Sequence, residues 1–333
     1  MDYRVALVGC GGVSEMHLDG CALHPERVRV VAACDPDSAR LAHIQQKYGI
    51  PAGFPSVAQM IAEAGWEVAI VCTPTSVREP VVAALAAAGK HVFVEKPLAS
   101  SLAEAERMVA TCASAGVQLA VDQNFRYHYP FYLAKERIAQ GVVGPVTGIL
   151  HQDLFFRQDR GWRTQERRHA LAVMGVHWLD GFRWILDSDA NVVFCQTRSS
   201  PAIECAGETD ATVQIGFDNG TVASYVQSFS SAVSRTETLI VGERGVLKLT
   251  YDGLTLHERG GAQPSATWAN PFSGAGKPQS AFEGLNQLLL ALEQEREAIS
   301  NGQDNLKTMT LLEAAYRSAA EGHVITLRAG ALP

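Results

Sequence analysis

The residue best placed to do chemistry in this chain is Lys96. It follows the apolar segment 91–94, which has the composition of a strand buried in a parallel sheet. Pro97 has no backbone donor and should end that strand, so Lys96 is expected at the carboxyl edge of the sheet, where ligands of such folds bind. A lysine at that edge can exchange a proton with a substrate hydroxyl. The alternative interpretation is a lysine that only pairs with Glu95.

A glycine-rich turn near the N-terminus supplies a second candidate site. An apolar run predicts a buried strand, and Gly9, Gly11 and Gly12 follow it where the chain must turn tightly and let a pyrophosphate approach the backbone. Val13 begins the next helix, whose first N–H groups and dipole favour phosphate. Ser14 stands at the third glycine position of the fingerprint and is small enough for helix and strand to pack closely. The pattern predicts a dinucleotide site.

An acidic residue at the end of the second predicted strand indicates which dinucleotide is bound. Asp35 lies 23 residues beyond Gly12, where a carboxylate accepts hydrogen bonds from the ribose hydroxyls and repels a 2′-phosphate. Asp37 adds to that repulsion, and Arg40, which could favour NADP, is expected on the outer face of a helix. NAD is therefore the predicted cofactor, with NADP less favoured. Together with a proton-exchanging lysine, this site predicts a dehydrogenase.

Motifs along nearly the whole chain resemble the Gfo/Idh/MocA family, the group of glucose-fructose oxidoreductase and inositol dehydrogenase. They lie at 72–75, 87–99, 124–127, 175–180, 242–245 and 313–319. The Glu-Lys-Pro triplet inside the second motif is the most specific. The resemblance implies an enzyme that transfers a hydride between NAD and a hydroxyl-bearing carbon of a sugar, inositol or sugar acid.

The resemblance also implies roles for single residues. It makes Lys96 and His177 the proton-handling pair in the substrate cleft, although a histidine on an apolar helix face is more often a core residue. Asp180 lies three residues further on the same helix face and could support His177. The implied cofactor contacts are Thr73, Pro74, Glu95, Lys96, Asn124, Trp162 and Arg163, and Arg126 is an implied substrate contact.

One position departs from the family pattern. The family commonly has an aspartate four residues before the histidine, and this chain has Val173 there. Either another acid serves, with Asp153, Asp159 and Glu166 available, or the chemistry has changed. Two alternatives therefore stay open. One is a redox-neutral enzyme in which bound NAD oxidises a sugar, allows elimination and reduces it again, and the other is a non-catalytic dinucleotide-binding regulator.

Five arginines lie between residues 157 and 169 of an otherwise acidic chain. A solvated, charged loop is the default interpretation of such a run. Arginine also binds carboxylate, sulfonate or phosphate groups through two parallel hydrogen bonds, so a negatively charged sugar is the second interpretation. Arg157, Arg163 and Arg168 are the candidate substrate contacts from this segment.

The order of predicted elements indicates two domains. Alternating strands and helices over residues 1–123 predict an NAD-binding domain with a doubly wound parallel Rossmann sheet. Over residues 124–333 the strands become longer and alternate in polarity, and Asp218-Asn219-Gly220 is a hairpin signal. This part predicts an α+β domain with an open, mainly antiparallel sheet, which would bind the substrate and form the oligomer. The fold class is therefore α/β followed by α+β.

Two further features of the second domain concern its surface. Residues 260–279 are rich in Gly, Pro and Ser and predict a long loop that could overhang the active site. The open sheet is expected to leave apolar positions uncovered, among them Val222, Ala223, Tyr225 and Val226. The uncovered face predicts a homodimer or homotetramer, and the family resemblance implies the same contact.

Composition excludes several classes of function. The chain has 333 residues, 47% of them hydrophobic, and a formal net charge of −7, so it suits two domains and offers no basic field for nucleic acid or a membrane surface. Seven cysteines without a Cys-x-x-Cys pair favour apolar filler in a reducing cytoplasm. No metal site is expected. The first strand begins almost at Met1 and no apolar stretch reaches membrane-spanning length, which predicts neither a signal peptide nor a membrane anchor.

Overall fold

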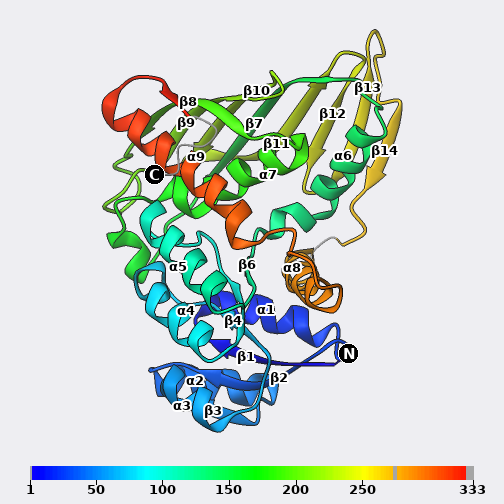
Figure 1. Cartoon of the computed structure of the whole chain (residues 1–333). Coiled ribbons are helices and arrows are strands. Elements are labelled where there is room, and N and C mark those ends of the chain that lie inside the picture. The colour runs from blue at the N-terminus through cyan, green and yellow to red at the C-terminus, as the bar shows by residue number, and fades with distance from the viewer. Residues whose placement is uncertain (1, 273–275, 328–333) are drawn as a thin grey trace. The chain divides into compact units, whose positions relative to one another are not determined.

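The computed structural model describes residues 2–272 and 276–327, and the chain divides into two compact units (Figure 1). The first unit comprises residues 1–127 and 274–309, and the second comprises 128–273 and 310–333. The sequence-based boundary after residue 123 lies close to the observed one. The sequence-based division nevertheless assigned 274–309 to the second domain, whereas this segment packs with the first unit.

The first unit is built on a parallel sheet of six strands in the order β3-β2-β1-β4-β5-β6. The strands are β1 (Tyr3–Val8), β2 (Val28–Cys34), β3 (Ala52–Phe54), β4 (Val68–Val71), β5 (His91–Val94) and β6 (Leu119–Val121). Their apolar runs are buried because helices cover both faces of such a sheet. The order reverses beside β1, which is the switch point at which doubly wound sheets bind nucleotides.

The helices of this unit begin where the sequence offers N-terminal caps. They are α1 (Gly12–Ala22), α2 (Ser38–Tyr48), α3 (Val57–Glu63), α4 (Arg78–Ala87) and α5 (Leu102–Ser114), with short 3-10 turns η1 (Thr75–Val77) and η2 (Asn124–Tyr127). The side chains of Asp37, Ser56 and Ser101 accept backbone N–H groups of the first turns of α2, α3 and α5. Helices α3, α4 and α5 pack side by side.

Helix α8 (Gly276–Glu293) explains why the first unit includes residues far along the chain. Phe282, Leu285 and Leu288 are buried in the same core as the strands of the parallel sheet. Gly20 lets α8 approach α1 closely, because a Cβ atom at this position would lie 2.5 Å from the carbonyl oxygen of Pro278. A sequence pattern cannot show which core an amphipathic helix joins, so the predicted domain boundary placed this helix wrongly.

The second unit is built on a nine-stranded sheet in the order β14-β13-β12-β11-β7-β10-β9-β8-β15. Its strands are β7 (Val146–Phe156), β8 (Ala190–Arg198), β9 (Asp210–Phe217), β10 (Val222–Ser228), β11 (Ser230–Gly242), β12 (Gly245–Thr250), β13 (Gly253–Glu258), β14 (Ala266–Ala269) and β15 (Ile325–Thr326). Among the described strand pairs of this sheet, only β7 and β10 pair in parallel. The predicted open, mainly antiparallel sheet is confirmed, as is the hairpin between β9 and β10, where Gly220 has φ +85°.

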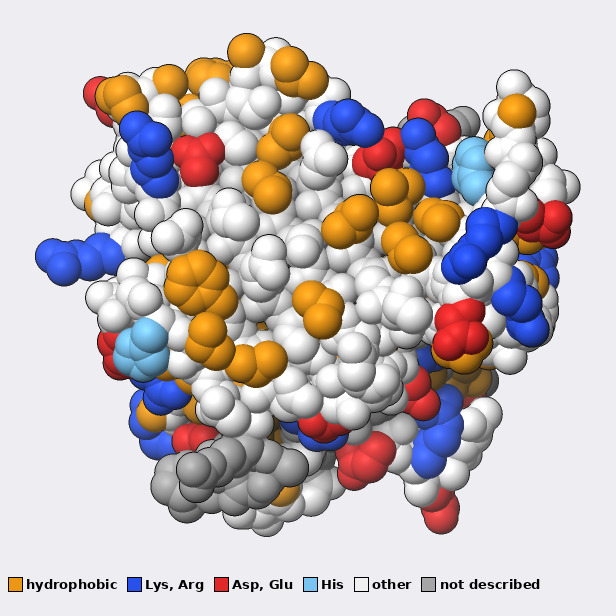
Figure 2. Space-filling view, turned by 90° about the horizontal axis from the view of Figure 1, so that it is seen from above, with side chains coloured by type: hydrophobic (Ala, Val, Ile, Leu, Met, Phe, Trp, Pro, Cys, Tyr) orange, Lys and Arg blue, Asp and Glu red, His pale blue; other side chains and the backbone are white. Residues whose placement is uncertain are grey.

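The two faces of this sheet differ in what covers them. Helices α6 (Tyr129–Ala139), α7 (Val176–Leu186) and the second half of α9 (Gly302–Glu321) lie on one face (Figure 1). Ala223 and Tyr225 point to that face and are fully buried, so the prediction that they are uncovered is wrong. Leu150, Val222 and Val226 point away from the helices and are 51%, 49% and 38% exposed. Figure 2 shows apolar side chains in separate groups on this outer side.

The predicted loop at residues 260–279 differs from the structure. Strand β14 interrupts it and pairs with β13, and α8 already begins at Gly276. Residues 273–275 of the predicted loop lie outside the described residues. Among the described residues, no helix combines the length and the apolar character needed to cross a membrane.

Candidate active site

The glycine turn after β1 has the geometry that a bound pyrophosphate requires. Gly9 has φ +93°, and a Cβ atom there would lie 3.0 Å from the backbone of Cys72 and Thr73. A Cβ atom on Gly11 or Gly12 would meet nothing within 4 Å, so these two residues border open space. Gly11 precedes α1 and no side chain caps that helix. The first N–H groups of α1 can therefore bind an anion.

Asp35 is fixed between this turn and the following helix. Its side chain is 6% exposed, and its Oδ2 and Oδ1 atoms accept the backbone N–H groups of Cys10 at 2.7 Å and Asp37 at 2.8 Å. Burial, together with the charge of Asp35, raises the pKa of Cys10 to about 12, so this thiol stays neutral. Arg40 is largely exposed, and its Nε lies 3.4 Å from Oδ2 of Asp37. Asp37 itself caps α2.

Polar atoms without partners gather at the carboxyl ends of β4 and β6. Among the described residues, Thr73 Oγ1, Asn124 Oδ1 and both amide atoms of Gln123 are buried and form no hydrogen bond. Thr73 leads to Pro74 directly after β4, and Gln123 and Asn124 follow β6. Buried polar atoms of this kind need a partner, and the ribose and carboxamide groups of a dinucleotide could supply it. Gln123 was missed from the sequence, although a polar residue just after a buried strand was the available signal.

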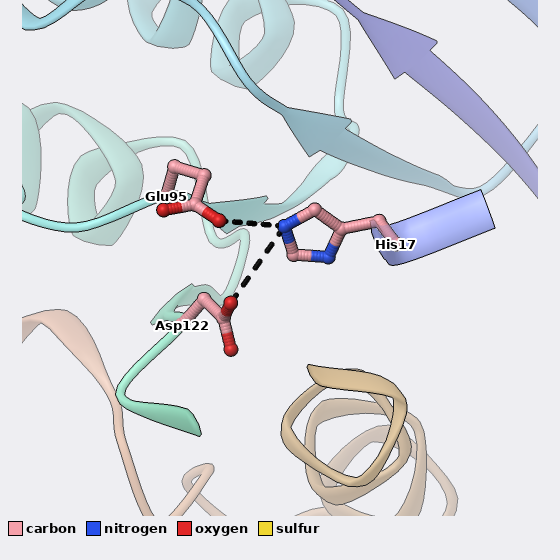
Figure 3. A group of neighbouring side chains, drawn as sticks. All are labelled: His17, Glu95 and Asp122. Atoms are coloured by element: carbon pink, nitrogen blue, oxygen red, sulfur yellow. Dashed lines mark hydrogen bonds and ion pairs between the residues drawn. The ribbon is translucent and has the colours of Figure 1, made fainter. Parts of the chain in front are cut away.

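Lys96 follows β5 and is half-buried, and its peptide bond to Pro97 is cis. Its backbone N–H donates to Glu95 Oε2 at 3.1 Å. The other carboxylate oxygen of Glu95 lies 2.8 Å from Nε2 of His17, a residue of α1 (Figure 3). Both oxygens of Glu95 are thus engaged inside the protein, which favours a supporting role for Glu95. Its predicted contact with the cofactor stays a prediction.

The glycine turn, Asp35 and the unpartnered polar atoms together fit a nicotinamide dinucleotide. The turn and α1 would hold the pyrophosphate, Asp35 the adenosine ribose, and Thr73 with Asn124 the nicotinamide half. Arg126, a predicted substrate contact, is buried, and its guanidinium donates to Asp304 Oδ2 at 2.5 Å and to the carbonyl of Ile299 at 3.0 Å. These contacts are internal to the first unit and favour a structural role for Arg126.

In the second unit, His177 lies in the first turn of α7 and is 5% exposed. The helix that carries His177 begins with a π-helical turn, Leu171–Gly175, and continues as α7. Val173 lies in that turn, whose i→i+5 hydrogen bonding differs from that of an α-helix. Asp180 is buried, and its Oδ1 lies 4.0 Å from Nη1 of Arg183. Such π-turns are frequent at functional sites.

Two of the five arginines in the arginine-rich segment pair with carboxylates. Nη2 of Arg157 lies 2.9 Å from Asp159 Oδ1, and His169 Nε2 lies 2.9 Å from the other oxygen of Asp159. Arg168 binds Glu313 through two hydrogen bonds of 2.6 and 2.7 Å. These contacts favour structural roles for Arg157 and Arg168.

The middle of this segment is a 3-10 turn in which an arginine stacks on an aromatic residue. The guanidinium of Arg163 lies 4.9 Å from the ring centre of the exposed Trp162, in the 3-10 turn Gly161–Gln165. Stacking of this kind leaves the outer N–H groups of an arginine available to a ligand. Arg163 therefore retains a donor set for a substrate better than the paired arginines do.

The acids that could replace the missing aspartate occupy different environments. Asp153 is fully buried and accepts hydrogen bonds from Trp178 Nε1 and Thr236 Oγ1, and burial raises its pKa. Burial also acts on Asp159, but its hydrogen bonds to His169 and Arg157 outweigh burial and lower its pKa to about 2. An acid with so low a pKa is a weak proton acceptor. Glu166 follows the 3-10 turn that holds Trp162 and Arg163.

Comparison with known proteins extends these observations to the whole chain. Residues 3–123 match the GFO/IDH/MocA oxidoreductase family with an NAD-binding Rossmann fold, and residues 131–248 match the C-terminal domain of the same family. Two D-apiose dehydrogenases, from Paraburkholderia graminis and Rhizobium rhizogenes, are each 30% identical over 98% of this chain, which covers 90% and 98% of their lengths.

A solved structure gives the same picture. An oxidoreductase from Agrobacterium radiobacter, crystallised with NAD+, L-tartaric acid and magnesium, superposes with a TM-score of 0.87 at 26% identity. The match covers 98% of this chain and 98% of that protein. The similarity therefore spans both units of the chain.

Proposed function

The chain belongs to the GFO/IDH/MocA family of NAD-binding oxidoreductases, and we propose that it transfers a hydride between NAD and a hydroxyl-bearing carbon of a sugar, polyol or sugar acid. Membership confirms the family, the two-part fold and the cofactor that the sequence predicted. The observation that carries the proposal is the placement of Lys96. It follows β5 at the carboxyl edge of the parallel sheet, where β5 adjoins β4, which leads to Thr73, and β4 adjoins β1, which leads to the glycine turn.

Lys96 acts as the general acid and base. NAD, when bound, accepts the hydride that leaves the substrate carbon. As the C–H electron pair leaves, the O–H bond of the same carbon breaks and its proton passes to the Lys96 amine, so the alcohol becomes a carbonyl. In the opposite direction the Lys96 ammonium returns the proton to the carbonyl oxygen. The contacts of Glu95 with the Lys96 backbone hold the amine in one place during either step.

His177 orients the substrate hydroxyl or shares its proton, and Asp180 supports the helix turn that carries it. Val173 stands where the family commonly has an aspartate, so one carboxylate is missing here. Lys96 therefore carries more of the proton transfer than in relatives that have the aspartate. Trp162 and Arg163 complete the substrate contacts. Gly11 and Gly12 bind the pyrophosphate, and Asp35 binds the adenosine ribose.

The substrate class follows from the relatives. The curated relatives at 30% identity are named D-apiose dehydrogenases, and the solved structure at 26% identity was crystallised with L-tartaric acid. Both compounds are polyhydroxylated, and one is a di-acid. We therefore propose small sugars, polyols and their acids as the substrates. The free state of all seven cysteines, six of them buried, agrees with a reducing cytoplasm as the working compartment.

The experiment that tests this function is a substrate screen. The protein is incubated with NAD and a panel of pentoses, inositols, uronic acids and aldaric acids, and formation of NADH is followed by absorbance. We expect NADH with at least one member, and loss of the signal in Lys96→Ala but not in the surface variant Lys47→Ala. Product formation without net NADH would point to the redox-neutral cycle. NADH binding with no product from any member would point to the regulator and contradict the proposal.

A further inference from the structure

A buried group of three ionisable side chains stands directly behind Lys96. His17 comes from α1, Glu95 from the end of β5 and Asp122 from the end of β6 (Figure 3). The three side chains are 2%, 6% and 1% exposed. Nε2 of His17 lies 2.8 Å from Glu95 Oε1 and 3.6 Å from Asp122 Oδ2. Two carboxylates in so dry a place require a compensating positive charge or a proton.

Protons meet this requirement within the cluster. Burial lowers the pKa of His17, but hydrogen bonding to Cys72 and Glu95 and the charge of Asp122 raise it well above the usual value. Burial, together with the charge of Glu95, raises the pKa of Asp122 well above its usual value. Burial acts in the same direction on Glu95, but His17 outweighs it and lowers the pKa. These directions favour a proton on His17, paired with the Glu95 carboxylate, and make Asp122 the weaker acid of the two carboxyl groups.

The Glu95 carboxylate links His17 to the backbone of Lys96. Oε1 is held by His17, and Oε2 accepts the N–H of Lys96 at 3.1 Å. Asp122 is backed by α8, because a Cβ atom on Gly284 would lie 3.2 Å from Asp122 Oδ1. The cluster is thus wedged between α1, α8 and the sheet and cannot easily rotate.

Arg78, a buried residue at the start of α4, holds the other side of the Lys96 segment. Its Nη1 donates to the carbonyl oxygen of Glu95 at 2.6 Å, to that of Leu98 at 3.3 Å, and to that of Pro97. Its Nη2 donates to the carbonyl of Thr73 at 2.6 Å. One guanidinium therefore ties the segment that carries Lys96 to the end of β4, where Thr73 borders the glycine turn.

We propose that His17, acting through Glu95, and Arg78 are positioning residues that hold Lys96 in the geometry its proton transfer requires. The proposal rests on the proposed function of Lys96. It assigns a role to two buried residues, from α1 and α4, that the sequence did not single out. A metal ion is the alternative occupant of the cluster, because His17, Glu95 and Asp122 are the described side chains that could together hold one. The 2.8 Å separation of His17 and Glu95 is that of a hydrogen bond and favours the proton.

The first test separates positioning from folding. His17→Leu is expected to lower kcat by about tenfold to a hundredfold while the dissociation constant for NADH changes by less than about threefold. His17→Gln, which keeps an N–H donor of similar reach, should restore most of kcat. In the Lys96→Ala background the effect of His17→Leu should largely vanish, because it acts through the same lysine. Cys21→Ala, a buried change on the same helix, is the matched control and should leave kcat unchanged.

The second test does not depend on turnover. The rate at which an acylating reagent modifies Lys96 is read by mass spectrometry against Lys47 in the same sample. We expect His17→Leu to change this rate by about threefold or more and Cys21→Ala to leave it unaltered. If no substrate of the panel is turned over, the proposed function fails. The acylation rate of Lys96 still tests whether His17 positions this lysine. Should His17→Leu not fold, Glu95→Gln serves in both tests with the same expected directions.

Wild-type kcat and wild-type labelling in His17→Leu, or equal losses from it with and without Lys96, would overturn the proposal. So would binding of one zinc ion per chain by the purified protein in zinc chloride, abolished by His17→Leu, since the cluster would then be a metal site.

Discussion

Asp35 and Cys10 are joined by a hydrogen bond of 2.7 Å from the Cys10 backbone N–H to the Asp35 carboxylate. The carboxylate that is expected to bind the ribose therefore also stabilises the glycine turn. Two functions meet in one side chain, and a substitution there should alter both the choice of nucleotide and the affinity for it.

We predict that the protein binds NADH more tightly than NADPH, because a 2′-phosphate against the buried Asp35 carboxylate would place two poorly solvated like charges together. Asp35→Ala should narrow the gap and also weaken NADH binding, since the turn loses its acceptor. Fluorescence titration with both nucleotides measures the two constants. Arg40→Ala, at an exposed position, is the control and should leave the affinities for NADH and NADPH unchanged. Equal affinities in the wild type would contradict the assignment.

We predict that Lys96→Ala keeps the fold and much of the NADH affinity but loses turnover by about a hundredfold or more, the usual scale for a general acid or base. His177→Ala should lose less, because its role is to orient the hydroxyl. The measurements are kcat on the substrate found in the screen and NADH titration on the same samples. Wild-type turnover in Lys96→Ala would refute its role.

We predict a homo-oligomer formed through the outer face of the nine-stranded sheet. Leu150 and Val222 lie on neighbouring strands, β7 and β10, about half exposed on a face that no described helix covers. Apolar side chains so arranged on a sheet favour a second copy of the same chain. Light scattering should give a mass above that of one chain, and Val222→Glu should lower it. Leu23→Glu, at an exposed apolar residue directly after α1, should not. A monomer at all concentrations would contradict the prediction.

Sequence patterns predicted those parts of the fold that depend on local burial. The parallel sheet was predicted because its strands are mostly apolar, as in β4, and the change to longer strands after residue 124 was predicted because their residues alternate, as in β7. Strand β13 was missed although it alternates, and β14 was missed because it lies in a Gly- and Ser-rich stretch. As an edge strand, β14 pairs only with β13, so its residues need little β-sheet propensity.

The candidate site could be predicted only where its residues form a motif with a fixed spacing in the sequence. Gly9, Asp35 and Lys96 stand at fixed places relative to predicted strands, so their location followed from the strand order. His17, Arg78 and Gln123 were not found, because each is a single polar residue in an apolar or helical context. Arg78 and His17 both bind Glu95, which lies 17 and 78 positions away from them in the chain. No local pattern records such a contact.

We predict that Asp159 stabilises the fold in a pH-dependent way. Its pKa falls from the ordinary 3.8 to about 2 in the folded protein, so its contribution is present above pH 3.8 and is lost as the pH falls toward 2. Asp159→Asn should lower the free energy of unfolding by about 1 to 2 kcal/mol near pH 6. The difference should shrink below about pH 4. Urea unfolding at several pH values measures it, with Asp252→Asn at an exposed turn as control. A difference that does not depend on pH would contradict the assignment.

The last prediction concerns the charge of the substrate. Arg168 is held by Glu313 and Arg157 by Asp159, whereas Arg163, the third arginine proposed from the sequence, stacks on the exposed Trp162. Val173 in place of an acid also lowers the repulsion that an anionic ligand would meet. We therefore expect a sugar or polyol with a negative group to be preferred.

Thermal protection of the NADH-bound protein measures this preference. Uronates, sugar phosphates or aldarates should raise Tm more than the matched neutral sugars, and Arg163→Ala should remove the difference. Arg168→Ala should instead lower Tm without any ligand, because it leaves the Glu313 carboxylate without its partner, and the preference for anions should survive. If neutral sugars such as apiose protect equally well, Arg163 does not bind an anion and the segment is a charged surface loop, so the substrate belongs to the neutral sugars.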